Sequence, residues 1–315
     1  MTEPDTVVVP FDELPRLPVA GLRHSWHVHG PGDQFGTLNR LTGDVVAAAA
    51  GAVRTGERIG LSLPLGLPDP SFFGRQPPKH TVFPMWPGAW DDRLDGFYPQ
   101  ASSQWDGLRH IAAPDGFYGG WQGSPDADPG PLGIQHWARQ GIIGRGMLID
   151  LAAGGHDPFE VKAFSVAEVE AVLREQGSRL RLGDILCVRT GWMDSYLALD
   201  EQGRRELAER MADPLGYRCA GLSGSEEMSR FLWDSGAAAV TADNPAVEVV
   251  PVDREAGSLH LRLIPCLGFA IGELFDFAAL AAACHRDGRY EFLFASVPLN
   301  LDGGCGSPAN AVAIR

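Results

Sequence analysis

The chain has 315 residues, of which 44% are hydrophobic and 21% charged, a composition typical of a globular protein with a large apolar core. The 40 Asp and Glu residues outnumber the 26 Lys and Arg residues, which gives a formal net charge of −14 at pH 7. No cluster of basic residues interrupts this acidic balance, so we expect neither nucleic acid nor a membrane as a partner. The first residues, MTEPDTVVVP, lack the basic and apolar parts of a secretory signal, so a cytoplasmic protein is expected.

Two regions rich in Pro and Gly precede the regular part of the chain. Residues 1–40 are predicted to form an N-terminal arm, and Thr42 is predicted to open a helix that runs to about Thr55. Residues 64–132 are irregular and rich in aromatic side chains. Because linkers do not carry Trp and Phe at this density, we interpret this region as binding loops packed over a site.

Capping signals mark two further helices. Ser165 and Glu168 form a capping box at the start of one predicted helix. A second box, from Ser223 to Glu226, predicts a helix that ends near Gly236.

Short apolar runs alternate with these helices and predict buried strands. Another helix is predicted from Leu274 to Cys284. Strands that alternate with helices favour a single mixed α/β domain over residues 1–315, with helices covering a sheet. The runs are MLIDL (147–151), DILCVR (184–189), AAAVTAD (237–243), GFAI (268–271) and YEFLFASVPLNL (290–301).

Two pairs of side chains could carry chemistry. Asp106 and His110 stand four residues apart, and they would converge on one ion if the segment ran from a strand into a turn. Glu273 follows an apolar run at a predicted helix start, where an α/β sheet delivers side chains to a crevice, and His260 precedes it. Taken singly, these residues also fit ordinary capping, surface or structural roles.

Several long segments in the same order make the sequence resemble the putative cyclase family, which includes kynurenine formamidases and isatin hydrolases. The resemblance spans nearly the whole chain and implies that family's swivelling β/β/α fold. The segments are GDQFGTLNRLT (32–42), SQWDGLRH (103–110), GIIGRGMLIDL (141–151), GDILCVRTGW (183–192), the segment around Asp243, His260 to Leu274 with GFAIGEL, and PLNLDGGCGSPANAVAI (298–314).

The resemblance implies a metal site, with a departure from the family motif H-x-G-T-H-x-D-x-P-x-H. Gln100 and Gln104 replace the first two histidines, and Leu108 replaces the proline. Because an amide oxygen is a weaker zinc ligand than an imidazole, a two-zinc site is doubtful. The implied ligands of a single Mn²⁺ or Zn²⁺ are Asp106, His110, His260 and Glu273, and their hard oxygens favour Mn²⁺.

By resemblance, the chain is a metal-dependent hydrolase of a non-peptide C–N bond, in a cyclic amide or formamide, or of an ester. The expected substrate is an aromatic or alicyclic small molecule, and the expected assembly is a homo-dimer or homo-tetramer. The expected catalytic residues are Asp106, His110 and Glu273, with either His110 or Glu273 moving the proton. The expected substrate contacts are Gln104, Trp86, Trp90, Phe97, Trp105 and Trp121.

Two alternatives remain open. The glutamines could mark a metal-poor cyclase or lyase that acts on a secondary-metabolite intermediate. The chain could also be a binding protein that kept the fold without catalysis.

Overall fold

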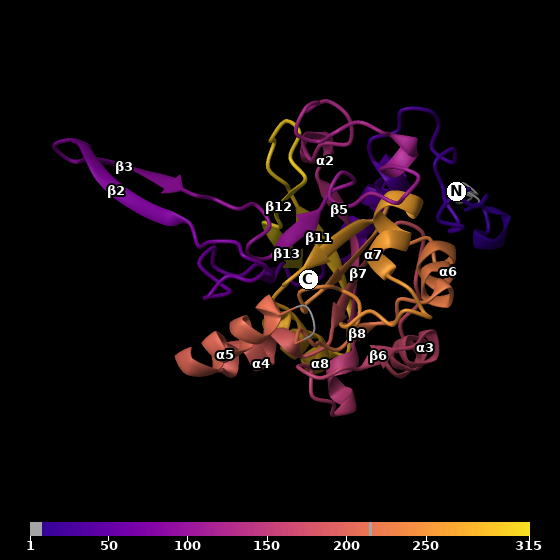
Figure 1. The fold of residues 1–315 in the computed structure, drawn as a ribbon. Helices are drawn as coiled ribbons and strands as arrows, with labels where there is room; N and C mark the ends of the chain where they lie inside the picture. Colours follow the sequence, from indigo (N-terminus) through magenta and orange to yellow (C-terminus); the bar gives the residue numbers. More distant parts are fainter. Residues whose placement is uncertain (1–7, 214–215) are drawn as a thin grey trace.

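A nine-stranded sheet forms the centre of the computed structural model, which describes residues 8–213 and 216–315 (Figure 1). The first seven residues of the predicted arm, and with them most of MTEPDTVVVP, lie outside the described residues. In spatial order the strands are β1 (Arg58–Gly60), β13 (Ala311–Ile314), β11 (Glu291–Ser296), β5 (Ile142–Asp150), β7 (Ile185–Arg189), β9 (Ala239–Ala242), β10 (Ala270–Glu273), β4 (Gln104–Asp106) and β12 (Gly306–Pro308).

The centre of this sheet is parallel and its flanks are antiparallel. Strands β5, β7, β9 and β10 run parallel to one another, whereas β11 and β4 pair antiparallel on either side of them. The parallel strands are the apolar runs that the sequence predicted as buried strands, because both of their faces are covered. The predicted mixed sheet is confirmed.

Helices cover the two faces of the sheet. Leu148 and its same-face neighbours pack with α8, whereas Met147 and Ile149 pack with α3 and α6 on the opposite face. This alternation follows the two-residue period of a strand. The helices are α1 (Gly43–Ala49), α2 (Gln135–Gln140), α3 (Val166–Glu175), α4 (Trp192–Ala198), α5 (Glu201–Ala212), α6 (Glu226–Asp234), α7 (Leu259–Leu261) and α8 (Ala278–Asp287).

The predicted caps are partly confirmed. Ser165 and Glu168 form the capping box of α3, with both reciprocal hydrogen bonds present. Helix α6 is capped by Ser225 rather than by Ser223, whose hydroxyl instead accepts from the Ser225 amide. The boundary differs because Ser225 stands directly before the first helical residue, where its side chain reaches the Met228 amide.

Two predicted helix bounds were wrong. Helix α1 ends at Ala49 and continues only as one 3-10 turn, well before Thr55. Helix α8 begins at Ala278, because Glu273 is the last residue of β10 and a bend follows it. Glu273 therefore reaches its position from a strand end and not from a helix start.

Part of the predicted loop region is regular. Strands β2 (Lys79–Trp86) and β3 (Ala89–Asp95) form a separate two-stranded hairpin that projects from the body of the molecule (Figure 1). The remaining pair, β6 (Ala163–Phe164) and β8 (Gly221–Leu222), is parallel and short.

The described part of the N-terminal arm packs on the body. Phe11 and Leu14 are buried in the apolar cluster formed with α3 and α6. No helix in the described ranges combines the length and the apolar character that crossing a membrane requires.

Candidate metal centre

Strands β4 and β10 place the first two carboxylates side by side. The strands are antiparallel neighbours, with Gln104 opposite Glu273 and Asp106 opposite Ile271. Because side chains alternate along a strand, Gln104 and Asp106 point to the same side, and Trp105 points to the other. The strand-then-turn geometry predicted for the Asp106 segment is therefore present, with His110 at the end of the turn.

His260 comes from the helical side of the centre. It lies in α7, whose first turn is capped by the Ser258 hydroxyl through the Leu261 amide. The chain then continues as a π-helix, Arg262–Leu267, which contains Pro265 and ends at Gly268 in the left-handed region. Segments of this kind are common at functional sites, because the wider turn re-aims side chains.

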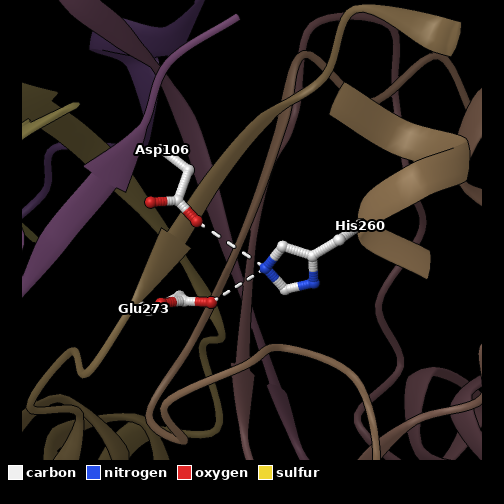
Figure 2. A group of neighbouring side chains, drawn as sticks. All are labelled: Asp106, His260 and Glu273. Carbon is white, nitrogen blue, oxygen red and sulfur yellow. Dashed lines mark hydrogen bonds and ion pairs between the residues drawn. The ribbon is translucent and has the colours of Figure 1, made fainter. Parts of the chain in front are cut away.

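Asp106, His260 and Glu273 converge although they come from three segments (Figure 2). The His260 Nε2 atom lies 3.0 Å from Glu273 Oε1 and 3.6 Å from Asp106 Oδ2. One ligand atom from each residue lies within 4.8 Å of the others, so the three can hold a metal ion. Both carboxylates are almost completely buried, with exposed fractions of 1% for Asp106 and 5% for Glu273.

The two glutamines that replace motif histidines lie in the same cluster. The Gln100 side-chain amide donates to Asp106 Oδ1, and the Gln104 amide donates to Glu273 Oε2. The Gln104 amide also lies 3.5 Å from Asp106 Oδ1, so Asp106 has two amide donors and Glu273 has one, in addition to their contacts with His260. These donors reduce the cost of burying two acids next to each other.

His110 occupies the more exposed side of the cluster. Its Nδ1 lies 3.2 Å from the Gln100 amide nitrogen, and its Nε2 lies 3.9 Å from Asp106 Oδ1. With 27% of its side chain exposed, it stands between the buried acids and solvent. It lies outside the group of three that could share an ion, so its predicted role as a ligand stays a prediction.

The buried ionisable groups shift one another's pKa values. Burial and the neighbouring Asp106 charge raise the pKa of Glu273 to about 7. Burial opposes ionisation of Asp106, but His110, His260 and the Gln100 amide outweigh it and hold its pKa below the usual value. Burial also opposes the charged form of His260, yet its carboxylate neighbours raise its pKa well above the ordinary range. The cluster is therefore organised around positive charge placed between carboxylates.

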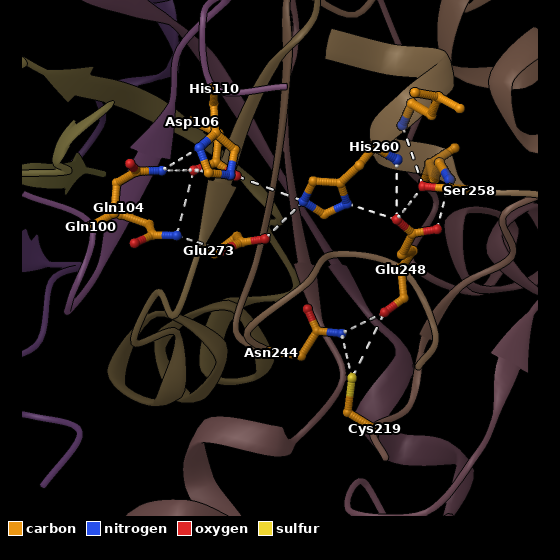
Figure 3. Close-up of polar contacts among 12 residues, drawn as sticks. Gln100, Gln104, Asp106, His110, Cys219, Asn244, Glu248, Ser258, His260 and Glu273 are labelled. Atoms are coloured by element: carbon orange, nitrogen blue, oxygen red, sulfur yellow. Dashed lines mark hydrogen bonds and ion pairs between the residues drawn. The ribbon is translucent and has the colours of Figure 1, made fainter. Parts of the chain in front are cut away.

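A carboxylate that the sequence did not single out completes the centre (Figure 3). Glu248 is 3% exposed, and its Oε1 lies 2.7 Å from His260 Nδ1, on the opposite edge of the ring from Asp106 and Glu273. The available signal was a single acid inside the apolar run AVEVV, since a charge in such a run is buried only when it is paired.

Two acceptor oxygens of the cluster support a cation. Gln104 Oε1 and Asp106 Oδ2 are buried and have no hydrogen-bond partner among the residues that the structure describes. Unpaired buried acceptors are costly, and a cation relieves that cost. The residues present therefore fit a divalent ion, with Asp106, His260 and Glu273 as its holders.

The predicted aromatic pocket is not assembled as expected. Trp105 is fully buried, donates its indole N–H to Ser296 and packs against Phe275, because it lies on the core side of β4. Trp86 and Trp90 lie on the projecting hairpin, where they are 64% and 69% exposed. Trp105 therefore faces the core, and the predicted substrate contacts of Trp86 and Trp90 stay predictions.

Two predicted aromatic contacts remain: Phe97, which is half-buried just after β3, and Trp121, which lies nearer the turn that carries His110. Trp121 is half-buried, packs against Phe117 and lies under the Arg109 guanidinium. No contact among the described residues joins it to the three converging side chains, so its role in binding stays a prediction.

The chain is an α/β protein built on a mixed sheet. Two acids at strand ends and one histidine from a neighbouring helix form its carboxylate–imidazole centre. A profile of the family described as putative cyclase matches residues 59–249. The chain therefore belongs to the putative cyclase family, which confirms the resemblance seen in the sequence.

Solved structures agree with this assignment. A crystal structure of a novel cyclase is 32% identical with a TM-score of 0.80, and the match covers 93% of this chain and 99% of that chain. Isatin hydrolase A from Labrenzia aggregata, bound to benzyl benzoate, is 15% identical with a TM-score of 0.59, over 88% of this chain and 98% of that chain. Isatin hydrolase A from Ralstonia solanacearum is 16% identical with a TM-score of 0.57, over 85% and 94%. At these lower identities the likeness is one of fold, and the comparison with curated proteins finds no match.

Proposed function

We propose that the chain is a metal-dependent hydrolase that cleaves a C–N bond of a cyclic amide or formamide, or an ester bond, in an aromatic or alicyclic small molecule. The observation that carries this proposal is the convergence of Asp106, His260 and Glu273 within 4.8 Å in a member of the putative cyclase family. The names of the isatin hydrolases with the same fold support the choice of a hydrolase and of a small cyclic substrate.

Three residues of the centre would bind the metal ion, and a fourth would transfer the proton. Asp106, His260 and Glu273 would hold one Mn²⁺ or Zn²⁺, and the predominance of oxygen donors favours Mn²⁺. A divalent ion at this position supplies Lewis acidity, which polarises a carbonyl and makes water a better nucleophile near neutral pH. His110, which is partly exposed beside the acids, is placed to move a proton between the reacting group and solvent.

Glutamine in place of histidine replaces an imidazole nitrogen donor with a harder amide oxygen donor. The Gln104 amide turns its nitrogen toward the carboxylates, and rotation of the amide would turn its buried oxygen toward them as a weak additional ligand or a substrate contact. Which of these it does depends on the orientation of the amide, since its oxygen and nitrogen exchange places on rotation.

The test measures metal content and turnover together. We expect wild-type protein purified with Mn²⁺ to bind one equivalent and to hydrolyse a cyclic amide or aryl ester. Asp106→Ala and His260→Ala should lose metal affinity by more than the roughly 100-fold that loss of an outer partner costs, and should lose turnover with it. Asp184→Asn is a matched control, because Asp184 is equally buried but pairs with Arg145. Retention of full turnover after metal removal would contradict the proposal.

A second candidate is a cyclase or lyase that works without a metal. The observation in its favour is that the Gln100 and Gln104 amides, with His260, already supply donors to both buried carboxylates. Activity that survives prolonged chelation, in protein shown to be free of metal, would favour this candidate over the hydrolase.

A further inference from the structure

We propose that Glu248 is the positioning residue of this centre, which fixes the His260 ring with Nδ1–H on Glu248 and Nε2 turned toward Asp106 and Glu273. The inference rests on the proposed function only in the part that concerns the metal. Glu248 touches neither Asp106 nor Glu273 in any described contact and acts through the imidazole between them (Figure 3).

Four donors point at the Glu248 carboxylate. Its Oε1 accepts from the His260 backbone amide at 3.1 Å, from His260 Nδ1 at 2.7 Å and from the Ser258 hydroxyl at 3.1 Å. Its Oε2 accepts from the Leu259 amide at 2.6 Å. The two backbone amides and the Ser258 hydroxyl stabilise the ionised carboxylate, which can only accept, so the 2.7 Å contact to the ring places a proton on Nδ1.

The hold on His260 is double. One oxygen of Glu248 binds both the backbone amide and the ring of the same residue, which fixes the start of α7 and the rotamer of the side chain together. A ring held in this way leaves Nε2 as the nitrogen that faces the two carboxylates, at 3.0 and 3.6 Å. Carboxylates behind a ligating histidine commonly set its tautomer and orientation in metal sites.

Contacts between the backbone around Glu248 and neighbouring segments hold Glu248 in place. Its carbonyl accepts from the Asn244 amide, and the neighbouring residues pair with Leu222 of β8. The backbone of Gly221 packs so closely that a Cβ there would lie 2.3 Å from the Glu248 carbonyl carbon. Val247 adopts the left-handed region with φ of 55°, a strained conformation that surrounding contacts must maintain. The segment is thus built to present this carboxylate at one point.

Wild-type protein provides the first test, because it requires no variant to fold. The ring nitrogens of His260 in ¹⁵N-histidine-labelled, metal-free protein are observed by NMR and assigned by their loss in His260→Gln. We expect one set of ring signals and an Nδ1 proton that exchanges slowly with solvent, because Glu248 accepts it. A rapidly exchanging Nδ1 proton, or more than one set of ring signals, would overturn the proposal.

The second test substitutes the carboxylate. In Glu248→Gln one acceptor oxygen becomes a donor that faces another donor, so the ring should lose its single orientation. We expect a second set of His260 ring signals in the metal-free protein and a 10- to 100-fold weaker affinity for Mn²⁺ by titration calorimetry. Glu248→Asp, which keeps the charge, should restore part of that affinity.

The matched control is Glu168→Gln. Glu168 also accepts at the start of a helix, from the Ser165 amide and hydroxyl, but it lies in α3 outside the centre. We expect it to leave Mn²⁺ affinity unchanged. A Glu248→Gln protein that keeps one set of ring signals and wild-type Mn²⁺ affinity would overturn the proposal. If wild-type protein binds neither Mn²⁺ nor Zn²⁺, the hydrolase proposal fails, and the ring signals alone still decide the role of Glu248.

Discussion

Gln104 is the side chain that we expect to set the preference of this centre between Mn²⁺ and Zn²⁺. Gln104 stands where the family motif has histidine, opposite Glu273 on the neighbouring strand and 1% exposed. Its amide now donates to Glu273 and leaves its oxygen unpaired. The same position with an imidazole would offer a nitrogen ligand, which zinc prefers to an amide oxygen.

We therefore expect Gln104→His to raise the affinity for Zn²⁺ at least about tenfold, equivalent to about 1.4 kcal/mol. Competition titrations with a chromogenic chelator measure this directly. Gln202→His, on an exposed position of α5, controls for the added histidine. Equal Zn²⁺ affinity in wild type and Gln104→His would show that position 104 does not face the ion.

The residues of the centre could be predicted from the sequence, but the residue that supports them could not. Asp106, His260 and Glu273 were predicted from strand ends and the family motif, and the structure brings them together. Glu248 was missed, because its partner His260 is a contact made only after α7 folds against the segment before it. Trp105 faces the core rather than the acids, because side chains alternate along β4 and Trp105 lies between Gln104 and Asp106.

Elements with strong local signals were predicted best. The capping box of α3 needs only residues three apart, so Ser165 and Glu168 identified it correctly. The hairpin of β2 and β3 was predicted as loop, because its strands contain Pro84 and charged residues and bury neither face.

The α3 capping box predicts a pH dependence of stability. Hydrogen bonds from Lys162 and Ser165 to the Glu168 carboxylate lower the pKa of Glu168 to about 2. Because the folded-state pKa lies below the unfolded value of about 4.3, the stabilisation is complete above that value and is lost as pH falls toward 2. With 41% of the side chain exposed, we expect only about 0.5–1 kcal/mol.

Urea unfolding of wild type and Glu168→Gln at several pH values measures this contribution. The difference in unfolding free energy should be constant from pH 7 to 5 and shrink below pH 4.5. A difference that stays the same down to pH 3 would mean that the carboxylate contributes nothing as a charge.

In the molecule as a whole, the projecting hairpin exposes apolar side chains that no contact within a single chain covers. Its exposed large apolar side chains, each more than 40% accessible, are Val82, Met85, Trp86, Trp90 and Leu94. Contiguous exposed apolar groups usually mark contacts with another molecule. They suit the homo-oligomer that the family resemblance predicted.

We expect the double variant Trp86→Ser, Trp90→Ser to have a lower mass than wild type by multi-angle light scattering. The free energy of unfolding of the monomeric variant should differ from that of wild type by no more than about 0.5 kcal/mol, because neither side chain is buried in the single chain. The same mass for both proteins would exclude the hairpin tryptophans from any contact between copies.

Anomalous diffraction at the manganese and zinc edges, from crystals grown with each metal, tests whether the three converging side chains hold a metal ion. We expect one strong peak bounded by Asp106, His260 and Glu273, with ligand atoms at roughly 2.0–2.3 Å. A map with no peak between these three side chains, at metal concentrations that support turnover, would contradict it.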